Sequence, residues 1–372
     1  MNYRVFLSLN ISASSGFDDG VWKSIFFDTF KSIGLDVYLF TYKQALDISK
    51  SKSPSRISEI ILDVFKKENK KKRFDIFFTY YNQNQVSEQL FSSLKGKILT
   101  VNYTTNFHQI GLYDKIIREV DCSIYASIDA SQYFKENAQN SYYMPFAALK
   151  KYSKYKQFKK NKISFIGTSY GNRPIYIWRC LQHKLPINIY GYGWKKPHKN
   201  KSILRSINLL RTLLIESSNR FNQSYRLLNE IVLSDIYKNF SENLYGPLSD
   251  SDYFNLLSNS QIILNFPESR YNHDYNNPNV LMGANLRDFE VPNSGSCLFT
   301  QRNDEILTFF EDEVDIVTFS NEWEMIDKLN FYKEKEEKLS KIALNGHKKV
   351  ISENLWDNRF VEFFKYLKLN YL

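Results

Sequence analysis

The segment from residue 285 to residue 300 places an acidic side chain, a basic side chain and a glycine at spacings that suit the recognition of a nucleotide. Arg287 and Glu290 are three positions apart, so they share one face of a predicted short helix that precedes an apolar strand. A carboxylate there can accept hydrogen bonds from both hydroxyls of a ribose, while the guanidinium binds phosphate oxygens. Asn285 begins the segment, and Gly295 lets the backbone approach a ligand closely. We therefore expect Asn285, Glu290 and Gly295 to bind a nucleotide and Arg287 to act on its phosphates.

A second candidate site lies where a predicted strand starting at residue 163 meets a predicted helix over residues 173–183. The small residues Gly167 and Thr168 end the strand, and the free N–H groups and dipole of the helix favour an anion. Arg173 begins the helix, so it could neutralise a departing diphosphate. The segment lacks the G-x-G-x-x-G pattern and the lysine of a P-loop. A plain turn with a solvated Arg173 is therefore the alternative.

Two further candidates follow predicted strands, at the carboxyl ends where parallel sheets bind their ligands. Tyr192 belongs to a glycine-rich turn after the strand that begins at residue 187, and we expect it to contact the nucleotide. His273 follows the strand predicted over residues 262–266 and could touch a sugar or a diphosphate. An ordinary surface histidine is the alternative interpretation of His273.

The short sequence Asp250-Ser-Asp252 has the spacing of the D-x-D motif that binds metals in some enzymes. Ser249 directly precedes it and an apolar helix follows, so N-capping by Ser249 is the better interpretation. The histidines show no spacing typical of metal ligands. We therefore expect neither a metal nor another cofactor.

Composition indicates two ordinary globular domains. The chain has 372 residues, of which 43% are hydrophobic and 24% charged, which excludes wholesale disorder. Its three cysteines form no C-x-x-C pair and lie in or beside apolar runs, so buried free thiols are expected. The apolar stretch among the first residues is too short for a signal peptide, and no apolar run is long enough to span a membrane. A cytoplasmic protein is expected.

The net charge of +10 would attract polyanions: nucleic acid, anionic lipid headgroups or the phosphates of a small ligand. A general bias of the sequence towards lysine is the alternative explanation. Basic residues gather around apolar ones over residues 195–243, which predicts an inserted pair of amphipathic helices. This insert would bind the inner face of an anionic membrane or an acceptor, or it is an extra helical layer with a solvated charged face.

Strands and helices alternate along the chain, which predicts parallel sheets with helices on both faces. In the first half, strands are predicted over residues 3–9, 37–41, 74–80, 98–102, 123–126 and 144–149. A highly charged run between residues 149 and 163 predicts a linker, after which a second set of strands begins. The expected domains are residues 1–150 and 151–354, followed by a C-terminal helix over residues 355–372 that packs back on the first domain.

The second half of the chain resembles the CgeB-like glycosyltransferases, two-domain enzymes of the GT-B fold that use nucleotide-activated sugars. The positions that carry this resemblance are Phe165, Gly167, Thr168, Arg173, Tyr190, Gly191, Trp194, Leu264, Asn265, Arg287, Phe289, Glu290, Gly295, Gly346 and Arg359.

The resemblance implies an α/β protein with two Rossmann-like domains that face a cleft. The second domain would bind a UDP-, GDP- or dTDP-linked sugar, with Glu290 on the ribose and Arg173 and Arg287 on the diphosphate. The first would bind a glycan, a lipid-linked or another cell-surface acceptor, as in polysaccharide biosynthesis. Transfer would retain the anomeric configuration and need no metal.

Two alternatives remain open at this stage. A basic transferase could glycosylate modified bases in DNA, because DNA phosphates suit its positive charge. The related E-x7-E pattern of retaining GT-B enzymes would place a first carboxylate where this chain has Met282. A protein that binds a nucleotide sugar or a polyanion without catalysis is therefore the second alternative.

Overall fold

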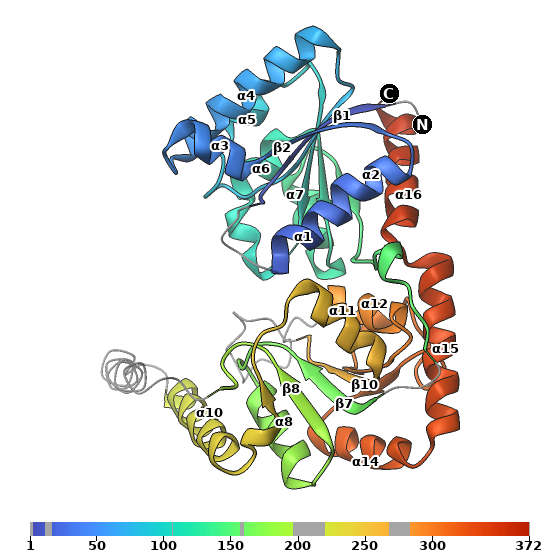
Figure 1. The fold of residues 1–372 in the computed structure, drawn as a ribbon. Coiled ribbons are helices and arrows are strands. Elements are labelled where there is room, and N and C mark those ends of the chain that lie inside the picture. The colour runs from blue at the N-terminus through green and yellow to red at the C-terminus, as the bar shows by residue number, and fades with distance from the viewer. Residues whose placement is uncertain are drawn as a thin grey trace. The chain divides into compact units, whose positions relative to one another are not determined.

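The structure is a computed structural model that describes residues 3–11, 17–105, 107–156, 160–195, 220–267 and 283–371. The chain forms two compact units, each built around its own parallel sheet (Figure 1). The first unit comprises Met1–Lys151 together with Val350–Leu372, and the second comprises Tyr152–Lys349. The C-terminal end of the chain therefore belongs to the first unit.

The sheet of the first unit has six parallel strands in the order β2-β1-β3-β4-β5-β6. Its strands are β1 (Arg4–Leu9), β2 (Asp36–Thr41), β3 (Ile76–Tyr80), β4 (Leu99–Thr104), β5 (Cys122–Tyr125) and β6 (Ser141–Tyr143). The four inner strands, β1, β3, β4 and β5, are almost continuously buried, as expected for a parallel sheet with helices on both faces, whereas the outer strands β2 and β6 are mostly half-buried.

Helices cover both faces of the first sheet. They are α1 (Phe17–Lys23), α2 (Thr29–Ser32), α3 (Tyr42–Ser49), α4 (Pro54–Lys71), α5 (Gln89–Ser92), α6 (Asp114–Glu119), α7 (Ser131–Asn137) and α16 (Trp356–Asn370). A π-helical turn, η1 (Ser24–Asp28), joins α1 to α2, and short 3-10 turns lie at Phe107–Leu112, Ile128–Ala130 and Lys150–Tyr152. The ring of Phe360 in α16 packs 4.7 Å from that of Phe30, so α16 lies beside α2 (Figure 1).

The sheet of the second unit also has six parallel strands, in the order β12-β11-β10-β7-β8-β9. Its strands are β7 (Asn161–Ile166), β8 (Ile187–Tyr190), β9 (Leu244–Tyr245), β10 (Ser260–Asn265), β11 (Cys297–Gln301) and β12 (Val317–Phe319). The order reverses between β7 and β10, which are neighbours in the sheet although far apart in sequence.

The helices of the second unit again lie on both faces of the sheet (Figure 1). They are α8 (Arg173–Gln182), α10 (Arg220–Asn239), α11 (Asp250–Asn259), α12 (Leu286–Asn293), α13 (Asp304–Leu307), α14 (Glu322–Lys333) and α15 (Glu336–Glu353), with a 3-10 turn at Ser241–Asn243. Side chains of α8, α10, α14 and α15 share one apolar core with β7 and β10. Helix α15 continues across the boundary between the two units.

The two-sheet α/β architecture predicted from the alternation of strands and helices is confirmed, but several local predictions are wrong. No strand forms over residues 144–149, because the last strand of the first sheet ends at Tyr143 and only Ala148 makes an isolated bridge, to Leu355. The short strand β9 and the helix α3 were not predicted. Of the predicted insert, residues 196–219 lie outside the described part of the chain, and α10 forms most of the described remainder.

All three cysteines, Cys122, Cys180 and Cys297, are buried free thiols, as predicted. Burial raises the pKa of Cys122 and of Cys180 to about 12, so neither thiol forms a nucleophilic thiolate near neutral pH. Among the residues that the structure describes, no helix combines the length and the apolar character that crossing a membrane requires.

Candidate functional site

The candidate site lies at the carboxyl ends of β7 and β10, where the strand order of the second sheet reverses. In open parallel sheets the connections on either side of such a point leave in opposite directions and open a crevice for a ligand. Gly167 directly follows β7, and Asn265 is the last residue of β10. The predicted phosphate-binding turn and the segment before α12 therefore meet at one edge of one sheet.

Hydrogen bonds to the next turn hold the backbone of Gly167. Its N–H donates to the carbonyl of Tyr190 at 2.9 Å, and its carbonyl accepts a bond of 2.6 Å from Nε1 of the buried Trp194. Gly191 has a φ of +134°, and a Cβ at this position would overlap the carbonyl oxygen of Gly167. Two turns at neighbouring strand ends thus fit together only because Gly191 has no side chain.

Tyr192 projects from this second turn. Its carbonyl accepts a hydrogen bond of 3.0 Å from the N–H of Ser169, which ties it to the turn that contains Thr168. Tyr192 is 68% exposed. The structure thus presents an accessible aromatic ring at the edge of the sheet where Gly167 lies.

Arg173 begins α8 and is buried, so the alternative of a merely solvated side chain is wrong. Its Nη2 donates to the carbonyl of Phe266 at 2.7 Å, and its Nη1 donates to the carbonyl of Thr168 at 3.3 Å. The guanidinium also lies over the ring of Tyr170, 4.0 Å from its centroid. Arg173 therefore links the end of β7 to the end of β10 and places a positive charge beneath the turn.

Asn285 is the N-cap of α12, and Asp288 completes a capping box with it. Asp288 is fully buried and accepts hydrogen bonds from Nδ2 of Asn265 at 2.6 Å and from Oγ1 of Thr300 at 3.0 Å. Burial raises the pKa of Asp288 to about 6, although these hydrogen bonds oppose the shift. Asp288 thus fixes the first turn of α12 against the end of β10.

Glu290 follows Asp288 by two residues in α12 and is 4% exposed. The hydroxyl of Tyr253, near the start of α11, donates a hydrogen bond of 2.6 Å to Oε2 of Glu290. Burial raises the pKa of Glu290 to about 7, while the Tyr253 hydroxyl and the charge of Arg287 act in the opposite direction. The carboxyl group is therefore shared between its protonated and ionised forms near neutral pH.

Arg287 lies between Glu290 and the end of β10. Its Nη1 donates to Oδ1 of Asn265 at 3.4 Å, a long hydrogen bond. Its Nε is buried and has no hydrogen-bond partner among the described residues. A buried N–H without an acceptor lowers stability unless a ligand supplies one, so Arg287 is suited to bind an anionic oxygen.

Gly295 lies at the opposite edge of the same sheet, because it precedes β11 and all strands are parallel. Its φ is +74°, and an added Cβ would come within 3.0 Å of the Tyr155 ring and of the Lys154 carbonyl oxygen. The space beside Gly295 is therefore filled by the segment that precedes β7. The structure assigns Gly295 to packing and separates it from Gly167.

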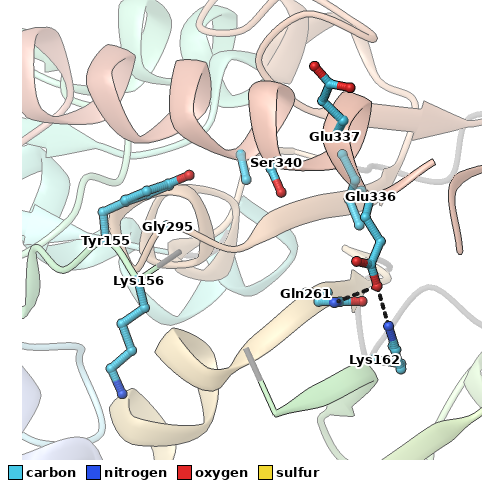
Figure 2. A pocket seen from close by; sticks show the side chains of 10 residues that line it. Tyr155, Lys156, Lys162, Gln261, Gly295, Glu336, Glu337 and Ser340 are labelled. Carbon is cyan, nitrogen blue, oxygen red and sulfur yellow. Dashed lines mark hydrogen bonds and ion pairs between the residues drawn. The ribbon is translucent and has the colours of Figure 1, made fainter. Parts of the chain in front are cut away.

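A pocket of about 400 Å³ opens at this opposite edge (Figure 2). Gly295, Tyr155 and Lys156 line it together with residues from the starts of β7, β10 and α15. Lys162 and Gln261 both contact the carboxylate of Glu336 across it (Figure 2). Of the predicted site residues it contains Gly295 alone, so it is distinct from the site at the carboxyl ends.

Two other residues singled out in the sequence, His273 and Met282, lie outside the described residues. The prediction for Asp250-Ser-Asp252 is confirmed, because the hydroxyl of Ser249 accepts a hydrogen bond of 3.2 Å from the N–H of Asp252 and caps α11.

Sequence reasoning missed Tyr253 and Tyr170. The only local signal for Tyr253 was its position in the first turn of a predicted helix, because its partner Glu290 is distant in sequence.

The site combines the buried guanidinium group of Arg173, the partly buried one of Arg287, the N-terminus of α8 and the buried carboxyl group of Glu290. Guanidinium groups and helix N-termini bind anionic oxygens, and an ionised carboxylate accepts hydrogen bonds from hydroxyl groups. The arrangement therefore suits a ligand that carries both phosphate and vicinal hydroxyls. An exposed aromatic ring at the same edge, that of Tyr192, could stack on a planar group.

Comparison with known proteins gives an independent result. The sequence model of a family described as glycosyl transferase-like matches residues 176–365, just over half of the chain. No curated protein matches the sequence.

Among solved structures, the chain is similar to sucrose-phosphate synthase from Thermosynechococcus elongatus, with a TM-score of 0.64 and 9% identity over 98% of both chains. It is also similar to a glycosyltransferase from Rickettsia africae, with a TM-score of 0.61 and 13% identity over 100% of both chains. HepE from Anabaena, in complex with UDP and glucose, matches with a TM-score of 0.59 and 9% identity over 98% of this chain and 99% of its own. These likenesses and the two parallel sheets show the two-domain α/β GT-B fold, as predicted.

Proposed function

Because the chain belongs to the glycosyl transferase-like family, a family of glycosyltransferases, we propose that its second unit binds a nucleotide sugar as donor. The sugar is transferred to a glycan, a lipid-linked acceptor or another cell-surface acceptor. The quoted sequence positions favour the CgeB-like subtype. The similar HepE structures contain UDP and UDP-glucose, which supports a uridine nucleotide as the first donor to test.

The observation that carries this proposal is the convergence of Arg287 and Glu290 with Gly167 at the carboxyl ends of β7 and β10. The ionised carboxylate of Glu290 accepts hydrogen bonds from the ribose hydroxyls. The buried Nε of Arg287, which makes no hydrogen bond to the described residues, binds an oxygen of the diphosphate. Tyr192, 68% exposed, stacks on the nucleobase.

The charge that develops on the leaving diphosphate is stabilised by Arg173, Arg287 and the N-terminus of α8. Preorganised positive groups of this kind make a large contribution to catalysis, because they need no reorganisation during the reaction. The bond between the anomeric carbon and the phosphate oxygen breaks through an oxocarbenium-like state. The acceptor oxygen bonds to the same face of the sugar, and its proton passes to the departing phosphate. The products are a glycoside with retained configuration and a nucleoside diphosphate.

The proposal is tested by thermal unfolding in the presence of UDP-glucose, GDP-mannose and dTDP-glucose. We expect one nucleotide class to raise the melting temperature of the wild type and to have little effect on Glu290→Gln. Glu59→Gln, which removes an exposed carboxylate from α4, is the control and should respond like the wild type. Equal shifts in wild type and Glu290→Gln would remove Glu290 from the ribose site.

Release of nucleoside diphosphate then separates an enzyme from a binding protein. We expect slow release with water alone and faster release when a glycan or lipid-linked acceptor is added. Binding of a donor without turnover under any of these conditions would favour the non-catalytic alternative. Salt-sensitive binding and glycosylation of DNA would favour the DNA-modifying alternative.

A further inference from the structure

Tyr253 in α11 makes a short hydrogen bond to Glu290 in α12, and its hydroxyl also interacts with Arg287. Its hydroxyl oxygen lies 2.6 Å from Oε2 of Glu290, and its side chain is 3% exposed. The two residues lie on different helices and are 37 positions apart, so their contact depends on the packing of α11 against α12. A bond of this length between a hydroxyl and a carboxylate is charge-assisted and strongly directional.

We infer that Tyr253 is a positioning residue for donor recognition, which holds the Glu290 carboxylate in the orientation that accepts the ribose hydroxyls. This inference rests on the proposed function, because it assigns Glu290 to the ribose. The hydroxyl of Tyr253 occupies one lone pair of Oε2 and leaves Oε1 for the ligand. Without it, the carboxyl group can rotate about its terminal torsion, which has broad minima.

Tyr253 also affects the pKa of Glu290, together with the charged groups around that carboxyl group. Burial raises the pKa of Glu290, and Asp250, from the start of α11, acts in the same direction. The Tyr253 hydroxyl on α11 and Arg287 on α12 both lower that pKa. Loss of the Tyr253 hydroxyl therefore leaves more of Glu290 protonated near neutral pH. A protonated carboxyl group accepts hydrogen bonds from hydroxyls more weakly than a carboxylate does.

The main test compares UDP with 2′-deoxy-UDP in wild type and in Tyr253→Phe, which removes the hydroxyl and keeps the ring. For UDP at pH 7.5 we expect roughly tenfold weaker binding by calorimetry in the variant, the size expected for a hydrogen bond to a charged group. For 2′-deoxy-UDP, which lacks one of the hydroxyls, we expect a clearly smaller loss. Equal losses for both ligands would mean that Tyr253 only supports the fold and would overturn the inference.

A pH profile provides the second readout. UDP-glucose suits it because its diphosphate diester does not titrate between pH 6 and pH 9. In the wild type, affinity should rise as pH passes through about 7, where Glu290 ionises. In Tyr253→Phe, the rise should occur at higher pH, because the hydroxyl that favours the carboxylate is gone. Superimposable profiles would contradict the inference.

Tyr332→Phe is the matched control, since the hydroxyl of Tyr332 donates a hydrogen bond of 3.0 Å to Oε2 of Glu313 in the same unit but outside the site. It should leave the ratio of UDP to 2′-deoxy-UDP affinity unchanged.

The double variant Tyr253→Phe/Glu290→Gln keeps the test decisive if the single variant folds poorly, because it leaves no buried carboxylate without its donor. We expect it to bind UDP as weakly as Glu290→Gln alone, and additive losses would overturn the inference. If Glu290→Gln bound UDP like the wild type, the assignment of Glu290 to the ribose in the proposed function would fail. If Glu290→Gln bound weakly but Tyr253→Phe bound normally, only the role of Tyr253 would be wrong.

Discussion

Nδ2 of Asn265, the last residue of β10, donates a hydrogen bond of 2.6 Å to Oδ1 of Asp288 in α12. Asp288 is fully buried, and its carboxylate also accepts a hydrogen bond of 2.9 Å from the backbone N–H of Asn285. This contact fixes the first turn of α12 at the point where the strand order reverses. Arg287 and Glu290, on either side of Asp288, are thereby held beside the end of β10. The position of the proposed donor site thus depends on a buried carboxylate that need not touch the donor.

Replacement of Glu290 by glutamine should change how stability depends on pH. Burial raises the pKa of Glu290 from 4.5 to about 7, so the folded state binds its proton more tightly than the unfolded state. This contribution to stability is fully present below pH 4.5 and is lost as pH rises through about 7. Glutamine mimics the protonated form and does not titrate. We therefore expect Glu290→Gln to gain on the order of 2 kcal/mol relative to wild type between pH 5 and pH 8.

Urea unfolding at pH 5 and pH 8, followed by tryptophan fluorescence, measures this difference. Glu59→Gln, the exposed control, should keep the pH dependence of the wild type. If Glu290→Gln and wild type lost the same free energy of unfolding between the two pH values, Glu290 would not be buried in the way the structure shows.

Replacement of Gly191 by alanine should damage both folding and donor binding. Its φ is +134°, and the new methyl group would overlap the carbonyl oxygen of Gly167, so the turn that we propose to bind phosphate must move. We expect a loss of about 3 kcal/mol or more in the free energy of unfolding, together with weaker nucleotide binding.

Gly96→Ala is the control, because Gly96 also has a positive φ, +69°, but a Cβ there has no described atom within 4 Å. It should cost about 1 kcal/mol through backbone strain alone and leave nucleotide affinity unchanged. Equal destabilisation of the two variants in urea would show that the contact between Gly191 and Gly167 is not tight.

The sequence predicts much of the fold, because local signals are sufficient for it. The alternation of strands and helices predicts two parallel sheets, and the helix that begins at Arg173 and the cap at Ser249 lie where they were expected. The pairing of β7 with β10 is not encoded locally, because it joins strands that are separated by almost a hundred residues. The location of the site at the reversal of strand order therefore follows from the structure.

Only part of the candidate site could be predicted, because contacts between residues that are distant in sequence are not encoded locally. Residue type and spacing point to Arg173, Arg287 and Glu290, and the structure gathers these three at one edge of the sheet. Side chains that act through a partner distant in sequence, such as Tyr253, carry no local signal. The role of a glycine is also ambiguous in a sequence, because close approach of a ligand and close packing of the chain both require the absence of a Cβ.

Gly295 therefore provides a direct test of that ambiguity. An added methyl group would lie 2.8 Å from the ring of Tyr155 and 3.0 Å from the carbonyl oxygen of Lys154, in a backbone with a φ of +74°. We expect Gly295→Ala to lose about 2–3 kcal/mol of stability in urea unfolding, because part of the contact is with rigid backbone. Nucleotide affinity, measured by calorimetry below the melting temperature, should stay within about twofold of wild type, a difference of about 0.4 kcal/mol.

Gly167→Ala is the informative comparison, because its methyl group would lie 2.9 Å from the Phe165 ring and 3.2 Å from Nη1 of Arg173. This variant disturbs the turn that we assign to the diphosphate, so its nucleotide affinity should fall about tenfold or more. Loss of nucleotide binding in a folded Gly295→Ala protein would contradict the packing role and return Gly295 to the donor site. The opposite pattern, in which only Gly167→Ala binds weakly, follows from the separation of the two glycines at opposite edges of the sheet.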